Sequence, residues 1–159
     1  MDVIERGSRV FEELVVGILI NPEKDALFTL DERREMLVQL TARLPNVRVS
    51  VFGGLLVEFA RQEKAHVVVR GIRAISDYEY ELQMALMNRK LEPSLETVFL
   101  TAAEEFSYLS SRIVKDIARL GGAVDSMVPP LVKQRLHAKL AVSADPSPAA
   151  AAANFVKEH

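Results

Sequence analysis

Cations, serines and a glycine in this sequence have the chemistry needed to bind phosphate groups. They occur in three segments, each at or after the end of an apolar run, and they are Lys24, Arg70, Gly71, Arg73, Ser107, Ser110, Ser111 and Arg112. Guanidinium groups form paired hydrogen bonds with phosphate oxygens, and a glycine lets backbone amides approach a ligand closely. Serines at the start of a helix add hydroxyl groups and free amides at the positive end of the helix dipole. These residue types together indicate a site for the phosphates of a nucleotide.

Each of these segments alone is more often solvated surface, a helix cap or a turn. Their placement strengthens the functional interpretation. Lys24 follows the apolar run 15–20, Arg70 ends the run 66–70, and the serine-rich segment follows the run 97–100. If these runs are parallel strands, their carboxyl ends lie at one edge of the sheet, where open α/β sheets bind ligands.

Strand-like and helical segments alternate along the chain, and no repeat is visible. The expected strands are 15–20, 47–52, 66–70 and 97–100. The expected helices cover about 3–14, 29–40, 55–62, 78–91, 110–121 and 130–140. This alternation predicts an α/β fold in which a parallel, doubly wound sheet is covered on both faces by helices.

Local signals mark where several of these helices begin and end. Thr29 followed by Glu32 predicts a capping box, and Gly121 with Gly122 predicts a helix end. Pro130 suits the first turn of the last helix.

The composition is typical of one globular domain, with 49% hydrophobic and 26% charged residues among 159. The net charge of −2 argues against a general nucleic-acid binder, and the absence of cysteine excludes disulfides and thiolate chemistry. No apolar run in the sequence is long enough for a membrane span, so we expect a cytoplasmic protein without membrane partners. We expect one domain over 1–140 and a flexible, alanine- and proline-rich tail over 141–159.

The remaining titratable residues favour ordinary structural roles. His66 opens a strand and so lies at the wrong edge of the sheet, while His137 falls in the last helix and His159 in the tail. Asp77 and Glu79 open a helix, where acids complement the dipole. No set of carboxylates and histidines has metal-ligand spacing, which leaves magnesium carried by a nucleotide as the expected metal.

Four longer stretches resemble phosphopantetheine adenylyltransferases: GILINPEK, FTLDERREML, VVVRGIRAISDYEYELQMALMNRKL and VFLTAAEEFSYLSSRIVKDIARLGG. The resemblance runs from Asp2 to about Leu140, and the block 70–89 separates the chain from cytidylyltransferases and from the adenylyltransferases of NAD synthesis. It implies the Rossmann-like nucleotidyltransferase fold and reversible transfer of AMP from ATP to 4'-phosphopantetheine, giving dephospho-coenzyme A and pyrophosphate. It also implies Mg²⁺ bound with ATP, and a homohexamer.

Carried over position by position, the resemblance assigns Lys24 and Arg70 to the phosphate of phosphopantetheine and Leu56 to its pantetheine arm. The residues that it assigns to ATP are Gly71, Ile72, Arg73, Glu81, Phe106, Ser107, Tyr108, Leu109, Ser110, Ser111 and Arg112. Lys24 and Arg73 are the expected catalytic residues. Phosphoryl-type transfer needs aligned phosphates and neutralised charge, which cations and amides supply without a general base.

The sequence departs from the family at its start. Family members begin with a strand and a loop ending in a Gly-His pair, and neither has a counterpart here. We therefore expect a truncated chain that lacks the first strand, and a longer natural protein. Loss of the oriented histidine would lower the rate by about 10²–10³. A remnant that binds nucleotide or associates with full-length subunits stays an alternative, as does a related transferase acting on nicotinate mononucleotide or CTP.

Overall fold

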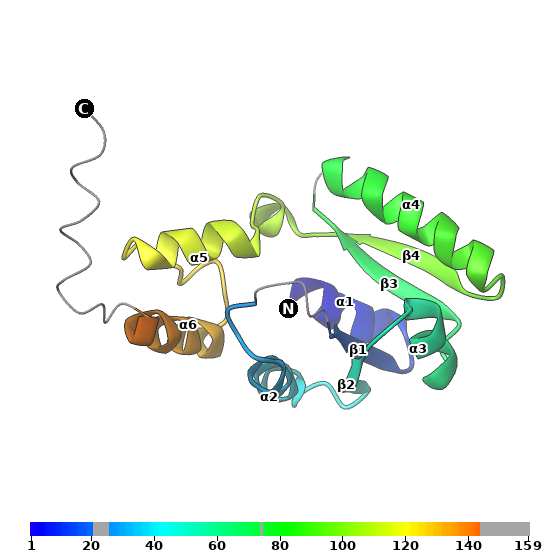
Figure 1. Cartoon of the computed structure of the whole chain (residues 1–159), viewed down its shortest axis with the longest axis horizontal. Helices are drawn as coiled ribbons and strands as arrows, with labels where there is room; N and C mark the ends of the chain where they lie inside the picture. Colours follow the sequence, from blue (N-terminus) through cyan, green and yellow to red (C-terminus); the bar gives the residue numbers. More distant parts are fainter. Residues whose placement is uncertain (21–25, 74, 144–159) are drawn as a thin grey trace. The chain divides into compact units, whose positions relative to one another are not determined.

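The computed structural model describes residues 1–20, 26–73 and 75–143 (Figure 1). The chain divides into two compact units, Met1–Leu109 and Ser110–His159. Among the described residues, the first unit contains all of the strands and the second contains helices α5 (Ser111–Arg119) and α6 (Pro130–Ser143). The predicted single domain over 1–140 stays a prediction, and residues 144–159 of the predicted tail lie outside the described residues.

Four strands pair in parallel within the first unit, as two sheets of two strands each. They are β1 (Leu14–Leu19), β2 (Val47–Phe52), β3 (Val67–Ile72) and β4 (Glu96–Thr101). β1 pairs with β2 and β3 pairs with β4, with Leu14 opposite Val47 and Val67 opposite Glu96. The four strands expected from the sequence are confirmed, because each is a short apolar run that is rich in β-branched residues.

The expected helices are also present, with boundaries that differ by a few residues. They are α1 (Asp2–Val10), α2 (Leu30–Thr41), α3 (Leu56–Gln62), α4 (Ile75–Leu91), α5 (Ser111–Arg119) and α6 (Pro130–Ser143), with a short 3₁₀ helix η1 (Glu104–Phe106) after β4. The capping box of α2 is confirmed: the Thr29 hydroxyl accepts from the Glu32 amide at 3.2 Å, and the Glu32 carboxylate accepts from the Thr29 amide at 2.7 Å.

Helices cover both faces of the strands in the first unit. On one face, α1 lies so close that a methyl group at Gly7 would be 3.3 Å from Leu14, and one at Gly71 would be 3.0 Å from Val3. On the other face, a methyl group at Gly17 would be 2.8 Å from the Phe59 ring of α3. Side chains alternate between faces along a strand, so this spacing fits a layered α/β arrangement.

Burial in the first unit is uneven. Val57, Ala60 and Leu95 form a buried cluster between α3 and the start of β4. In contrast, Ile18 is the only buried residue among β1, β2, β3 and β4. Strands this apolar are normally buried on both faces, so part of their surface lacks cover within the described structure.

The second unit contains α5 and α6, which contact each other. Val114, Ala118, Val124 and Leu136 are its buried apolar residues. The predicted helix end is confirmed, because α5 stops at Arg119 and Gly121 has a φ of +77°, a conformation that glycine adopts at low cost. An ion pair with Lys133 lowers the pKa of Asp125 below its ordinary value.

Candidate functional site

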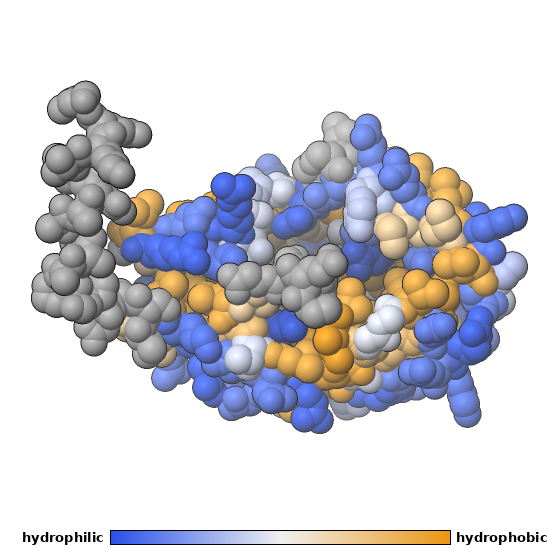
Figure 2. All heavy atoms as spheres, in the orientation of Figure 1, coloured by the Kyte–Doolittle hydropathy of each residue, from blue (hydrophilic) through white to orange (hydrophobic). Residues whose placement is uncertain are grey.

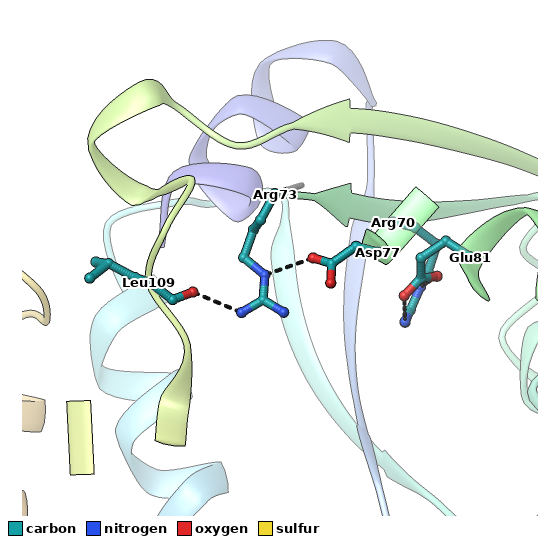
Figure 3. Close-up of polar contacts among 5 residues, drawn as sticks. All are labelled: Arg70, Arg73, Asp77, Glu81 and Leu109. Carbon is teal, nitrogen blue, oxygen red and sulfur yellow. Dashed lines mark hydrogen bonds and ion pairs between the residues drawn. The ribbon is translucent and has the colours of Figure 1, made fainter. Parts of the chain in front are cut away.

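Arg70 lies near the carboxyl end of β3, where a bidentate ion pair holds its guanidinium group (Figure 3). Its Nε and Nη2 atoms donate to the two carboxylate oxygens of Glu81 on α4, each at 2.7 Å. This hydrogen bonding raises the pKa of Arg70 above its ordinary value, so the side chain stays cationic. The side chain is 46% exposed and that of Glu81 is 12% exposed, so a ligand can reach the cation.

Arg73 follows β3 by one residue and has different partners. Its Nε donates to the Asp77 carboxylate at 3.0 Å, and its Nη1 donates to the Leu109 carbonyl at 2.8 Å (Figure 3). The side chain is 45% exposed. The guanidinium group is therefore held in place by two partners while part of it faces solvent.

Asp77 has a role that the sequence did not reveal. It lies in the first turn of α4, where an acid complements the helix dipole as predicted, but it also orients Arg73. The four-residue spacing between Arg73 and Asp77 could have indicated this ion pair, although Arg73 lies before the helix begins. The pairing of Glu81 with Arg70 was likewise not predicted.

Gly71 separates the two arginines and lies against α1. A side chain there would meet Val3 at 3.0 Å, so tight packing of helix on strand already explains a glycine at this position. Ile72 ends β3, and its carbonyl accepts from the Ala102 amide at 2.8 Å. Their predicted contacts with ATP stay predictions.

The segment after β4 contributes four more of the predicted residues. Phe106 ends η1, and the Ser107 hydroxyl donates to the Glu104 carbonyl at 2.7 Å. Tyr108 is 69% exposed, and Leu109 supplies the carbonyl that binds Arg73. The structure thus links this segment to the end of β3 through the hydrogen bond from Arg73 to Leu109, in addition to the one from Ala102 to Ile72.

Ser110, Ser111 and Arg112 begin the second unit and are described within it. Ser110 is the N-cap of α5, with its hydroxyl accepting from the Ile113 amide at 3.2 Å. Ser111 opens the helix, and the Arg112 side chain is 91% exposed. The predicted helix start is confirmed, whereas a shared site with Arg70 and Arg73 stays a prediction.

Two predicted substrate-binding residues remain. Lys24 lies outside the described residues. Leu56 is the first residue of α3 and lines a cavity in the first unit.

The histidines were predicted to lie away from the site. His66 precedes β3 at the amino edge, where its carbonyl accepts from the Glu96 amide at 2.9 Å, so this prediction is confirmed. His137 lies in α6, also as predicted, while His159 lies outside the described residues.

Parallel strands with cationic side chains at a carboxyl edge are typical of α/β proteins that bind nucleotides. The model of the family described as cytidylyltransferase-like matches residues 1–117 of the chain. One relative, named phosphopantetheine adenylyltransferase, of Caldanaerobacter subterraneus subsp. tengcongensis, is 48% identical over 139 residues, which is 87% of this chain and 87% of that protein. A second relative with the same name, of Clostridium kluyveri, is 48% identical over 129 residues, covering 81% of this chain and 79% of that protein.

The chain therefore belongs to the cytidylyltransferase-like nucleotidyltransferases and, within them, to the phosphopantetheine adenylyltransferases. The resemblance stated from the sequence motifs is confirmed, as are the fold class and the enzyme class. The comparisons favour an enzyme over a binding remnant.

Proposed function

We propose that the chain transfers AMP from ATP to 4'-phosphopantetheine, forming dephospho-coenzyme A and releasing pyrophosphate. The structural observation that carries the proposal is the pair of half-exposed arginines at the carboxyl end of β3, each oriented by a carboxylate. The name shared by the two relatives supports this choice of acceptor.

In the proposed reaction, a phosphate oxygen of phosphopantetheine attacks the α-phosphorus of ATP. A new phosphorus–oxygen bond forms, and the bond between the α-phosphorus and the bridging oxygen breaks, so pyrophosphate leaves with that electron pair. The attacking oxygen is already anionic, so no general base is needed. The protein must align the two phosphates and neutralise their charge.

The two arginines suit different parts of this task. Arg73 projects beyond β3 and would bind the polyphosphate of ATP, with Asp77 and the Leu109 carbonyl fixing its direction. Arg70 would bind the acceptor phosphate, which is a bidentate oxygen ligand like the Glu81 carboxylate that it contacts. Lys24 would join Arg70 at the acceptor phosphate.

We propose that Mg²⁺ arrives bound to the phosphates of ATP. Mg²⁺ commonly binds through substrate phosphates and water and needs few protein ligands. Within residues 1–20, 26–73 and 75–143, no group of three histidine, aspartate or glutamate side chains is placed to hold a metal ion.

The direct test supplies the purified chain with ATP, MgCl₂ and 4'-phosphopantetheine. Coupled pyrophosphate release measures turnover, and mass spectrometry identifies dephospho-coenzyme A. Nicotinate mononucleotide as acceptor and CTP as donor are run in parallel. Binding of ATP without turnover would favour the remnant, and product from either alternative substrate would favour a different transferase.

Arg73→Ala is expected to weaken the use of ATP more than Lys24→Ala does, because Arg73 would face the polyphosphate. Steady-state kinetics with each substrate varied in turn measure the effect, which we expect to be about 10²-fold in kcat/KM for ATP. Arg89→Ala is the matched control, since Arg89 pairs with Glu96 at the amino end of β4. Equal effects of Arg73→Ala and Lys24→Ala on both substrates would contradict this division of roles.

We further propose that the chain forms a homohexamer and is cytoplasmic, both from the family resemblance. Light scattering of the purified chain tests the homohexamer. Among the residues that the structure describes, no helix has the length and apolar character to cross a membrane.

A further inference from the structure

Two side chains in the first half of α1 contact the backbone where β4 ends (Figure 1). The Asp2 carboxylate accepts from the Ala103 amide at 3.0 Å, and Nη1 of Arg6 donates to the Thr101 carbonyl. The same Nη1 atom lies 3.4 Å from the Asp2 carboxylate, so the two side chains also pair with each other. The Asp2 side chain is 16% exposed and that of Arg6 is 39% exposed. α1 therefore holds the end of β4 through polar contacts that are partly shielded from water.

The strand ladder leaves both of these backbone groups without a partner. The amides of Glu96 and Ala102 donate to carbonyls on the β3 side at 2.9 and 2.8 Å. Backbone groups alternate in direction along a parallel strand, so the Thr101 carbonyl and the Ala103 amide point away from β3. Among the described residues, no other strand pairs with β4. Asp2 and Arg6 thus supply the partners that the ladder does not.

Burial does not fix the segment that follows β4. Figure 2 shows hydrophobic residues gathered in the region that β1, β2 and α3 occupy in Figure 1. By contrast, no residue from Thr101 to Leu109 is buried. A surface segment without buried side chains opens easily unless its backbone is hydrogen-bonded to a neighbour. Together with the bond from Ala102 to Ile72, the contacts from α1 therefore attach the start of this segment to the rest of the unit.

Short-range hydrogen bonds connect Ala103 to Leu109. The Ala103 carbonyl accepts from the Phe106 amide at 2.9 Å, which closes η1, and the Phe106 carbonyl accepts from the Leu109 amide at 3.2 Å. The Leu109 carbonyl then accepts from Nη1 of Arg73 at 2.8 Å. Because these bonds form one connected series, the position of the Leu109 carbonyl depends on where Ala103 is held.

Arg73 depends on this carbonyl for its direction. Its Nε donates to Asp77 and its Nη1 donates to Leu109, so the guanidinium group is held at two points. If the Leu109 carbonyl moved away, only the bond to Asp77 would remain, and the half-exposed side chain would gain rotational freedom. A ligand would then have to order the side chain on binding, which lowers its affinity.

We propose that Asp2 and Arg6 are positioning residues for the nucleotide. They fix the segment after β4 so that the Leu109 carbonyl holds Arg73 in the direction in which it meets the polyphosphate of ATP. They act through the backbone of Thr101 and Ala103 and not by touching substrate. This inference rests on the proposed function, in which Arg73 binds ATP.

Asp2→Ala and Arg6→Ala are the test variants, with two matched controls on the same helix. Glu5→Ala removes another acid from the first turn of α1, where Glu5 pairs with Arg43 and makes no contact with β4. Arg9→Ala removes an exposed cation from the last turn. Urea unfolding establishes that each variant is folded. If Asp2→Ala does not fold, Asp2→Asn replaces it, because it keeps the shape and loses the charge that binds the amide and Arg6.

Two measurements need no nucleotide. Hydrogen exchange of the Ala103 amide should accelerate by about 10-fold or more in Asp2→Ala, because a bond to a charged acceptor is lost. NMR of the Arg73 guanidinium reports its orientation, since a group held at both Nε and Nη1 rotates slowly and gives separate signals for its two terminal nitrogens. These signals should be separate in the parent chain and both controls, and should average in both test variants.

Calorimetric titration with ATP and MgCl₂ then measures the effect on binding. The Kd for ATP should rise by about 3–10-fold in Asp2→Ala and Arg6→Ala, and by less than about 2-fold in the controls. The Kd for 4'-phosphopantetheine should not change in any variant, because Glu81 and not Leu109 orients Arg70. Arg6→Lys keeps a donor that can reach the Thr101 carbonyl, so it should restore most of the affinity for ATP.

Three results would overturn the proposal. One is Arg73 guanidinium signals that are the same in the parent chain and in both test variants. Another is equal weakening of ATP and phosphopantetheine binding, and the third is an equal effect of the test and control variants, since each of these would indicate a general loss of stability. If the parent chain binds no ATP, the proposed function fails separately, and the two measurements without nucleotide still decide whether α1 positions Arg73.

Discussion

Arg70 and Arg73 are three residues apart, yet different partners orient their guanidinium groups. Glu81 holds Arg70 beside α4, whereas Asp77 and the Leu109 carbonyl hold Arg73 beside the segment after β4. Holding a cation before the ligand arrives reduces the entropy lost on binding. This geometry explains how neighbouring arginines could serve two phosphates.

The Arg70–Glu81 pair is expected to contribute about 1 kcal/mol of coupling energy to folding, because it is bidentate and Glu81 is largely buried. A double-mutant cycle of Arg70→Ala and Glu81→Ala, followed by urea unfolding, measures this coupling. The control pair is Arg112 and Asp116, whose Nε and Oδ2 atoms are 3.9 Å apart and whose side chains are 91% and 51% exposed. There the coupling should be near zero, and strict additivity at Arg70 and Glu81 would contradict the prediction.

At the scale of single elements, Gly17 fixes how closely α3 approaches β1. Its missing side chain makes room for Phe59 and Phe52, whose rings stack with centroids 4.1 Å apart. Gly17→Ala would place a methyl group 2.8 Å from one ring and 3.0 Å from the other, so we expect a loss of about 1–3 kcal/mol in unfolding free energy. Gly53→Ala is the control, because its new methyl group would lie 3.9 Å from Ile20. Similar stabilities of the two variants in urea unfolding would refute this account.

Glu63 connects α3 to β2 and makes stability depend on pH. The Ser50 hydroxyl donates to its carboxylate at 2.7 Å and Arg48 pairs with it at 2.6 Å, and these contacts lower the pKa of Glu63 below its ordinary value. Because the pKa of Glu63 is lower in the folded chain, its ionised carboxylate favours the folded state. This stabilisation is fully present at pH values above the unfolded pKa of about 4.3, and it is lost as the pH falls through the folded pKa.

Glu63→Gln should therefore reduce the unfolding free energy by about 1 kcal/mol at pH 7, and the difference from the parent chain should shrink below about pH 4. Urea unfolding at pH 7, 5, 4 and 3 measures this. Glu12→Gln, an exposed change of the same charge, is the control. A difference that stays constant across this range would show that the lowered pKa does not contribute to stability.

Elements could be predicted from the sequence where their signals are local. The capping box at Thr29 and Glu32, the β-branched strands and the helix end at Gly121 each depend on a few adjacent residues. The partner of Arg70 could not be predicted in this way. Whether Glu81 reaches Arg70 depends on how α4 lies beside β3, and no local pattern specifies that geometry. The spacing of Asp77 from Arg73 is a local signal, but Arg73 precedes the helix, so the helical spacing rule does not apply to it directly.

At the scale of the whole molecule, the chain forms two compact units with separate buried residues. Leu95 is 2% exposed in the first unit and Leu136 is 2% exposed in the second. The sequence predicts one domain over 1–140, and this stays a prediction beside the two compact units, whose boundary between Leu109 and Ser110 has no signature in composition. We therefore expect each unit to undergo local unfolding separately from the other.

Leu95→Ala and Leu136→Ala should each cost about 2–5 kcal/mol, since each leaves a cavity at a buried site. Leu120→Ala is the matched control, because Leu120 is 88% exposed and its truncation should change stability by less than about 0.5 kcal/mol.

Native-state hydrogen exchange measures which backbone amides each substitution destabilises. Leu95→Ala should accelerate exchange mainly in residues 1–109, and Leu136→Ala mainly in α5 and α6. Equal acceleration along the whole chain by both variants would mean that the two units unfold as one. In a single cooperative transition every amide exchanges through the same global unfolding, so either cavity would accelerate all of them equally.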